Sequence, residues 1–224
     1  ENGQPVFGPR DEAALVKVAA TGLPFWLAGG RSTPELIREA IASGAQGVQV
    51  GTVFALSEDS GFTPHYRNLL RSGISDGTLY VKTDRLASPT GFPFKVAQLQ
   101  ETVSNNEIYE ARPRLCDLGY LRAPYERSPG VVGYRCPSEP IDMYIKKGGK
   151  KEDTDGRMCL CNGLTVTIGI GQTRADGYSE APLMTLGSDL GGAQQLTNLY
   201  PAGWSATQAI EYMLSEQTAV SAAS

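Results

Sequence analysis

Apolar positions in the first part of the chain recur at spacings that predict alternating helices and strands. Asp11 precedes apolar residues at helical spacing, which predicts a helix that starts at this cap and ends at Thr21-Gly22. The continuous apolar run 24–28 is closed by Gly29-Gly30. A short apolar run of this kind is typical of a parallel strand that is buried on both faces.

The same alternation continues through the next thirty residues of the sequence. Thr33-Pro34-Glu35 combines a capping hydroxyl, a first-turn proline and an acid, which predicts a second helix ending near 43–45. Residues 47–52 predict a second strand that ends in Gly51-Thr52, and 53–56 can open another helical turn. This order is the βαβ pattern of a parallel sheet, and local pattern alone fits a closed barrel and a doubly wound sheet equally well.

The periodicity weakens after residue 57. The pattern predicts helices over 64–72, 94–99 and 106–112, a strand over 79–82, and a final amphipathic helix that begins after the cap residue Ser205. Residues 113–203 are dominated by Gly, Pro, Tyr and Cys, so we expect this long segment to be irregular.

Composition and charge exclude several classes of protein. The 224 residues carry a formal net charge of −4, and an acidic chain is not expected to bind nucleic acid. The one basic cluster, 146–151, is followed by acids and predicts a solvated loop. No apolar run is long enough to span a membrane, and no secretory signal is present, so we expect a cytoplasmic protein with no membrane partner. The chain starts at Glu1 rather than Met, and we expect it either to begin inside a longer reading frame or to follow a cleavage.

The two glycine turns are candidates for phosphate binding. Gly29-Gly30 and Gly51-Thr52 each follow a predicted strand and lead towards a helix N-terminus, where free N–H groups and the helix dipole favour an anion. Glycine also lets the backbone approach a phosphate without a side chain in the way. The alternative is that both are only tight turns between a strand and a helix.

Residues 25–30 and 45–52 resemble the flavin-phosphate region of the nitronate monooxygenase family, formerly called 2-nitropropane dioxygenases. Members of that family are FMN-dependent (β/α)₈ barrels, also known as TIM barrels. The resemblance implies that Gly29 shapes the first turn and that further residues contact FMN. Those residues are Gly30, Gln49, Val50, Gly51 and Thr52.

The resemblance also implies how the chain is organised. Residues 1–86 would form the C-terminal part of the α/β barrel, and residues 87–224 a loop-rich C-terminal extension that ends in a helix. Segments 112–121 and 159–164 resemble the extension of one bacterial branch of the same family. Eight strand–helix units are needed for a barrel, so the other strands are expected in a missing N-terminal barrel segment or a partner subunit.

The implied activity is the FMN-dependent oxidation of alkyl nitronates or nitroalkanes, as small-molecule substrates, by dioxygen. The family base is a His that precedes the phosphate loops, whereas the single His of this chain, His65, follows them and opens a predicted surface helix. We therefore assign no catalytic residue. Alternatives are a flavin-dependent enoyl reductase of acyl chains, a non-catalytic accessory or assembly module, and a phosphate-binding barrel of the inosine-monophosphate dehydrogenase type.

The four cysteines allow two interpretations. Cys116, Cys136, Cys159 and Cys161 could supply four thiolates to zinc or to an iron–sulfur cluster. However, the sequence has no Cys-x-x-Cys pair, and free Cys is among the most buried residue types. We therefore expect no metal and favour a packing role, and metal binding is the alternative.

Overall fold

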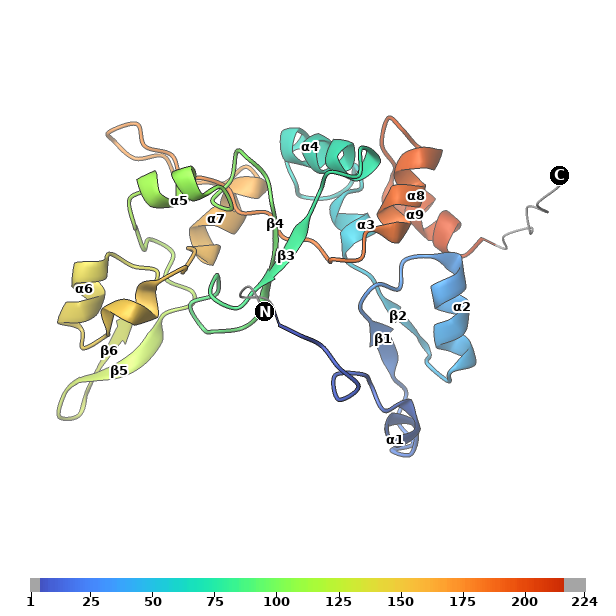
Figure 1. Ribbon diagram of the computed structural model, residues 1–224, viewed down its shortest axis with the longest axis horizontal. Helices are drawn as coiled ribbons and strands as arrows, with labels where there is room; N and C mark the ends of the chain where they lie inside the picture. The colour runs from blue at the N-terminus through green and yellow to red at the C-terminus, as the bar shows by residue number, and fades with distance from the viewer. Residues whose placement is uncertain (1–4, 216–224) are drawn as a thin grey trace. The chain divides into compact units, whose positions relative to one another are not determined.

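The computed structural model describes residues 5–215 and has a mixed α/β fold (Figure 1). The chain divides into two compact units. Among the described residues, unit 1 comprises 5–6 and 80–186, and unit 2 comprises 7–79 and 187–215. The division into a barrel part, 1–86, and an extension, 87–224, stays a prediction. The boundaries between the two compact units fall elsewhere, after residues 6, 79 and 186.

The α/β class is confirmed, but its sheets are small. Each of the three sheets in the described residues has two strands, and no closed barrel is present among them. Within residues 5–215, no helix is long and apolar enough to cross a membrane.

Unit 2 consists of one parallel strand pair and the helices of both its chain segments. Its elements are α1 (Leu15–Ala19), β1 (Trp26–Ala28), α2 (Pro34–Ala42), β2 (Gly47–Gln49), α3 (Thr52–Ala55), α4 (Pro64–Ser75), α8 (Gly191–Leu199) and α9 (Ala206–Met213). Strands β1 and β2 pair in parallel with Ala28 opposite Gln49, and α2 is the connection between them (Figure 1). The predicted βαβ unit is therefore confirmed.

Local capping explains why two helices of unit 2 begin where the sequence predicts. The hydroxyl of Thr33 accepts a hydrogen bond from the N–H of Leu36 at 3.4 Å, and Pro34 occupies the first turn of α2. Ser205 and Gln208 form a capping box at the start of α9.

The core of unit 2 joins its two chain segments. Leu56, Leu70 and Leu196 are fully buried, and so is Trp204, whose indole Nε1 donates to the carbonyl of Val53 at 2.8 Å. Helices α4 and α8 pack against each other, as do α2 and α9. The segment after residue 187 is thus an integral part of this unit.

Unit 1 contains two antiparallel strand pairs and short helices. Its elements are β3 (Val81–Asp84), β4 (Phe94–Ala97), α5 (Asn106–Ala111), β5 (Ala123–Ser128), β6 (Val131–Arg135), α6 (Ile141–Lys146), the 3₁₀ helix η1 (Lys151–Thr154) and α7 (Leu160–Thr167). Strand β3 pairs with β4, and β5 pairs with β6. Val103, Leu160 and Leu183 form the centre of its apolar core.

Several expectations about local structure were wrong. The predicted helix over 94–99 is strand β4, because pairing with β3 satisfies its backbone. The predicted buried strand 24–28 is shorter and exposed, with Trp26 at 60% exposure. Asp11 does not cap α1. Its carboxylate instead accepts from the N–H of Gly8 at 2.7 Å, and α1 begins after Ala14.

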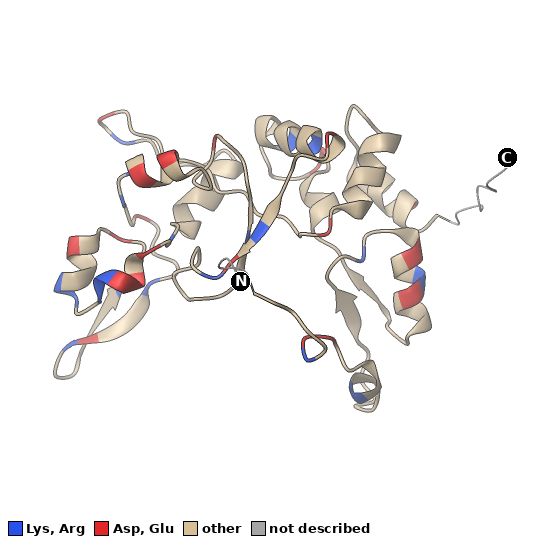
Figure 2. Cartoon of the chain, viewed as in Figure 1, with Lys and Arg blue, Asp and Glu red and all other residues tan. Residues whose placement is uncertain are grey.

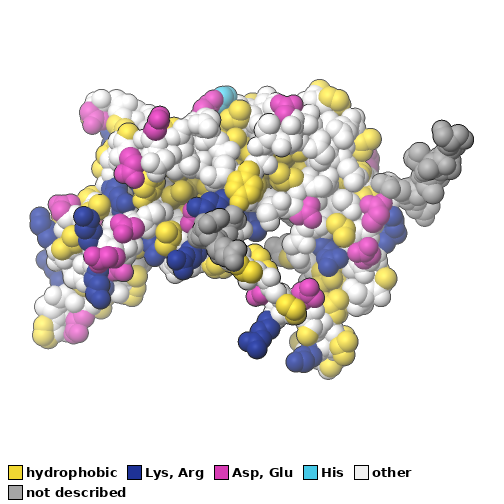
Figure 3. All heavy atoms as spheres, viewed as in Figure 1, with side chains coloured by type: hydrophobic (Ala, Val, Ile, Leu, Met, Phe, Trp, Pro, Cys, Tyr) yellow, Lys and Arg dark blue, Asp and Glu magenta, His cyan; other side chains and the backbone are white. Residues whose placement is uncertain are grey.

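The segment 113–203 is more regular than expected, since it contains β5, β6, α6, α7 and α8. The basic cluster 146–151 is a short, largely exposed turn between two helices, and its end residues belong to those helices. Lys146 ends α6 and Lys151 begins η1. The ammonium of Lys147 lies 2.7 Å from the buried carboxylate of Glu139, so part of this charge is neutralised. Basic and acidic residues are correspondingly interspersed around α6 and η1 (Figure 2) and on the face visible in Figure 3.

Candidate functional site

The two predicted phosphate loops lie at the same edge of the parallel sheet in unit 2. Ala28 and Gln49 are paired at the ends of β1 and β2, so Gly29 and Val50 follow side by side. Parallel strands place their carboxyl ends together, and that edge is where α/β proteins commonly bind ligands. The structure thus brings both loops together, as the sequence predicts.

The first loop owes its shape to consecutive glycines. Gly29 and Gly30 have φ of +86° and +65°, a left-handed conformation that disfavours other residues. A Cβ on Gly29 would meet no atom within 4 Å. The backbone here is therefore open to a ligand, and the turn leads directly to the cap of α2.

The second loop is open as well and offers a hydroxyl. Gly51 is exposed, and a Cβ at this position would also meet no atom within 4 Å. The hydroxyl oxygen of Thr52 accepts a hydrogen bond from the N–H of Gly187 at 3.0 Å, which leaves its own proton available for an acceptor. Gln49 is exposed and Val50 is half-buried at the same edge.

A third segment, residues 187–192, completes this edge and was missed by the sequence interpretation. A Cβ on Gly192 would lie 2.4 Å from the carbonyl oxygen and the hydroxyl of Ser32, so the first turn of α8 packs closely on the turn that precedes α2. Gly187 contacts Thr52 as described. We call the surface formed by residues 29–33, 49–53 and 187–192 the glycine edge.

The glycine edge carries charges of both signs. A Cβ on Gly30 would lie 2.5 Å from Oδ2 of Asp189, so this carboxylate occupies the space beside the first loop. The other oxygen, Oδ1, accepts from the N–H of Gly191, the first residue of α8, at 2.9 Å. Arg31 follows Gly30, and its guanidinium lies 4.0 Å from the carboxylate of Glu39.

One part of the glycine edge is therefore favourable for a phosphate, and another part is unfavourable. Open backbone at Gly29 and Gly51, together with the hydroxyl of Thr52, suits an anion. The carboxylate of Asp189 opposes an anion beside Gly30. FMN, if bound here, would place its phosphate towards Gly51 and Thr52 rather than against Gly30.

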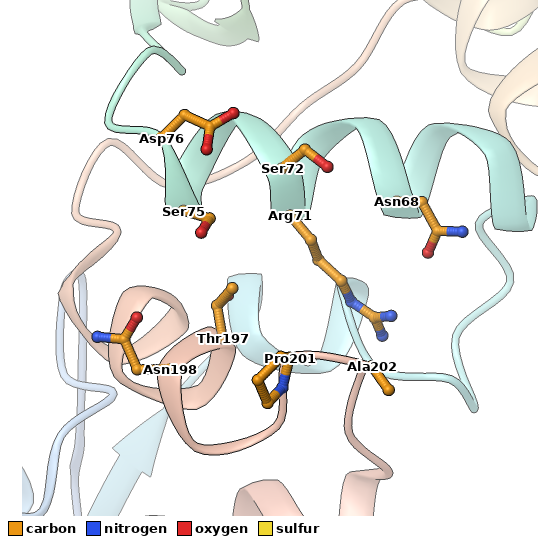
Figure 4. Close-up of a pocket in the computed structure, with 9 residues that line it drawn as sticks. All are labelled: Asn68, Arg71, Ser72, Ser75, Asp76, Thr197, Asn198, Pro201 and Ala202. Atoms are coloured by element: carbon orange, nitrogen blue, oxygen red, sulfur yellow. The ribbon is translucent and has the colours of Figure 1, made fainter.

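A polar pocket of about 540 Å³ lies between α4 and α8 of the same unit (Figure 4). Figure 4 shows the Arg71 side chain pointing from α4 towards the loop of Pro201 and Ala202. The guanidinium of Arg71 donates to the carbonyl of Leu56 at 2.8 Å and lies 2.5 Å from the carboxylate of Glu58. This arginine is thus occupied in holding the fold.

Unit 1 has an apolar pocket of about 490 Å³. Its walls include Phe92, Phe94, Leu160 and Leu164, with Cys161 at the same surface. These side chains belong to, or adjoin, the core of unit 1. They present no charged group to a ligand.

The other sequence candidates are not among the residues that form the glycine edge. His65 is exposed in the first turn of α4, as expected for a surface helix, and its ring contacts Tyr66 at 4.9 Å between centroids. All four cysteines belong to unit 1 and have free thiols. Among the described residues, no group of three or more His, Cys, Asp or Glu side chains could hold a metal ion.

Comparison of the chain with protein-family models, with curated proteins and with solved structures finds no match.

Proposed function

We propose that the glycine edge binds the phosphate of FMN, and that the protein is a flavin-dependent oxidoreductase acting on alkyl nitronates or nitroalkanes with dioxygen. The observation that supports this proposal best is the convergence of two glycine turns at the carboxyl ends of adjacent parallel strands. The βαβ unit formed by β1, α2 and β2 is also what two neighbouring units of a (β/α)₈ barrel would provide.

The roles proposed for individual residues follow from the geometry of the edge. Gly29 and Gly51 leave the backbone open to the phosphate, and Thr52 supplies a hydroxyl donor. Gly30 gives the first turn its left-handed shape. When bound, FMN supplies the redox chemistry, and these residues contribute anchoring and orientation.

The proposal is tested by comparing FMN with riboflavin, which has the same ring system but no phosphate. Quenching of flavin fluorescence on titration with the full chain gives both dissociation constants. We expect FMN to bind at least several-fold more tightly than riboflavin. The Gly51→Asp variant should remove this preference, because it places a carboxylate where the phosphate would lie.

Gly77→Asp is the matched control, since Gly77 lies in the same unit, outside the glycine edge, and a Cβ there also meets open space. Because Gly77 has a positive φ, circular dichroism must first show that this variant is folded. Equal affinities for FMN and riboflavin, or an unchanged FMN preference in Gly51→Asp, would contradict the assignment. Oxidation of an alkyl nitronate by the FMN-loaded protein, followed as dioxygen consumption, tests the reaction separately.

A further inference from the structure

Two cysteines of unit 1 meet at the open end of the β5–β6 hairpin. Ala123 and Arg135 are partners in the hairpin register, so the next residues outward, Arg122 and Cys136, lie beside each other. Cys116 reaches the same place from the loop after α5. Its sulfur accepts from Nε of Arg122 at 3.4 Å, and its carbonyl accepts from Nη2 at 2.7 Å.

The two segments that carry these cysteines are joined at a second point. Nη1 of Arg114 donates to the carbonyl of Pro137 at 3.3 Å. Arg114 is two residues before Cys116, and Pro137 directly follows Cys136. Each thiol also shifts the pKa of the other, in agreement with this geometry. Cys116 and Cys136 therefore lie on either side of Arg122, in the same part of unit 1.

Gly119 makes room for the arginine that faces this pair. Its φ is +67°, and a Cβ there would lie 2.8 Å from both Cζ and Nε of Arg122. Only glycine lets the guanidinium fold back over the turn towards the sulfur of Cys116.

The surroundings of the two thiols differ in a way that gives each a separate role. Cys116 is half-buried. The hydrogen bond from Cys136, together with the hydrogen bond and charge of Arg122, lowers its pKa to about 6, against the opposing effects of burial and Glu139. Cys136 is 5% exposed, and its pKa is raised by the hydrogen bond with Cys116 and by burial, with Ser138 opposing. At pH 7, Cys116 is therefore mainly the reactive thiolate.

We propose that Cys116 and Cys136 form a reversible redox site that reacts with hydroperoxides and closes a disulfide. In the first step, the Cys116 thiolate attacks one oxygen of hydrogen peroxide. The O–O bond breaks, and Cys116 sulfenic acid and hydroxide are formed. In the second step, the Cys136 sulfur attacks the Cys116 sulfur and displaces hydroxide, which leaves as water with the thiol proton of Cys136.

The balance of this reaction is simple. Two thiols are oxidised to one disulfide, and one peroxide is reduced to two waters. A reducing dithiol reverses it by thiol–disulfide exchange. A metal site is the weaker interpretation, because within the described residues no third ligand joins the pair and Arg122 already supplies the positive charge beside Cys116.

The test treats the full chain with hydrogen peroxide, blocks remaining thiols and digests the product with trypsin. Cleavage after Arg and Lys places Cys116 in peptide 115–122 and Cys136 in peptide 136–146, whereas Cys159 and Cys161 share peptide 158–174. We expect a cross-link between the first two peptides that disappears on reduction. Cys116 should also be modified several-fold faster than Cys161 at pH 7.

Three variants distinguish a specific reaction of Cys116 with Cys136 from nonspecific oxidation of all four cysteines. Cys136→Ser should stop at Cys116 sulfenic acid, which dimedone traps, and Cys116→Ser should form no disulfide. Cys161→Ser is the matched control and should keep the cross-link, with circular dichroism confirming the fold of all three variants.

Cross-linking of Cys116 to peptide 158–174, or equal reactivity of Cys116 and Cys161, would overturn the proposal. So would a tightly held zinc ion that Cys116→Ser releases, since the thiolates would then be metal ligands. The site lies in unit 1 and its test uses no flavin, so its outcome is independent of FMN binding by unit 2.

Discussion

Asp189 illustrates how a single side chain can set the character of a candidate site. Its carboxylate accepts a hydrogen bond from the N–H of Gly191 at the start of α8 and at the same time fills the space beside Gly30. The first role stabilises the helix, whereas the second places a negative charge where an anionic ligand would approach. Asp189 would therefore stabilise the start of α8 and at the same time weaken the binding of an anionic ligand.

This conflict leads to a prediction for Asp189→Asn. The amide oxygen can still accept from the N–H of Gly191, so the variant should fold normally, while removal of the charge should strengthen FMN binding several-fold. The gain should shrink as salt concentration rises, because salt screens exposed charges. Fluorescence titration at two ionic strengths measures both effects.

Asp176→Asn, an exposed position in unit 1, is the control for the change in net charge. If both variants strengthen FMN binding equally, the effect comes from the net charge of the protein, and the carboxylate of Asp189 does not act locally at the glycine edge.

Residue patterns predicted only part of this edge. Gly29, Gly30, Gly51 and Thr52 could be singled out because glycine turns after strands have a local signature. Asp189 could not, because it approaches Gly30 only through the tertiary fold. The proximity of Cys116 and Cys136 was missed for the same reason, since it depends on the hairpin register.

Among the elements, two helices with local caps were predicted well, whereas strand β4, which depends on pairing with β3, was not. Helices α2 and α9 begin at Thr33 and Ser205 because each residue bonds the backbone of its own first turn. Residues 94–97 carry no such signal, and their extended shape comes from pairing with 81–84.

The capping box of α9 gives a prediction at this scale. Ser205→Ala removes the side-chain acceptor for the N–H of Gln208 and should lower the free energy of unfolding by about 1 kcal/mol. Ser205→Thr keeps a hydroxyl acceptor, so its free energy of unfolding should fall by much less. Urea denaturation measures both values, and an equal loss in the two variants would mean that the cap contributes nothing.

The whole chain contains two units with separate cores, and its aromatic probes are distributed unequally between them. Trp26 and Trp204 both belong to unit 2. Leu183 lies in the core of unit 1, whereas Leu196 lies in the core of unit 2, and both are fully buried. Tryptophan fluorescence therefore reports on one unit alone.

We accordingly expect unfolding to depend on the probe. Leu196→Ala should lower the free energy of unfolding of unit 2 by about 2–5 kcal/mol. The transition detected by tryptophan fluorescence should therefore move to a lower urea concentration. Leu183→Ala should shift the transition seen by circular dichroism but leave the tryptophan signal nearly unchanged. Coincident shifts of both signals in both variants would show that the units unfold as one.

Unit 2 is built from two stretches of chain with unit 1 between them, and this order has a consequence for synthesis. When residues 7–79 leave the ribosome, α8, α9 and Trp204 have not yet been made. Unit 1 can complete its own core first, whereas Leu56 and Leu70 must wait for their later partners. The glycine edge, which needs Gly187 and Asp189, is thus assembled only after unit 1 and these two residues have been translated.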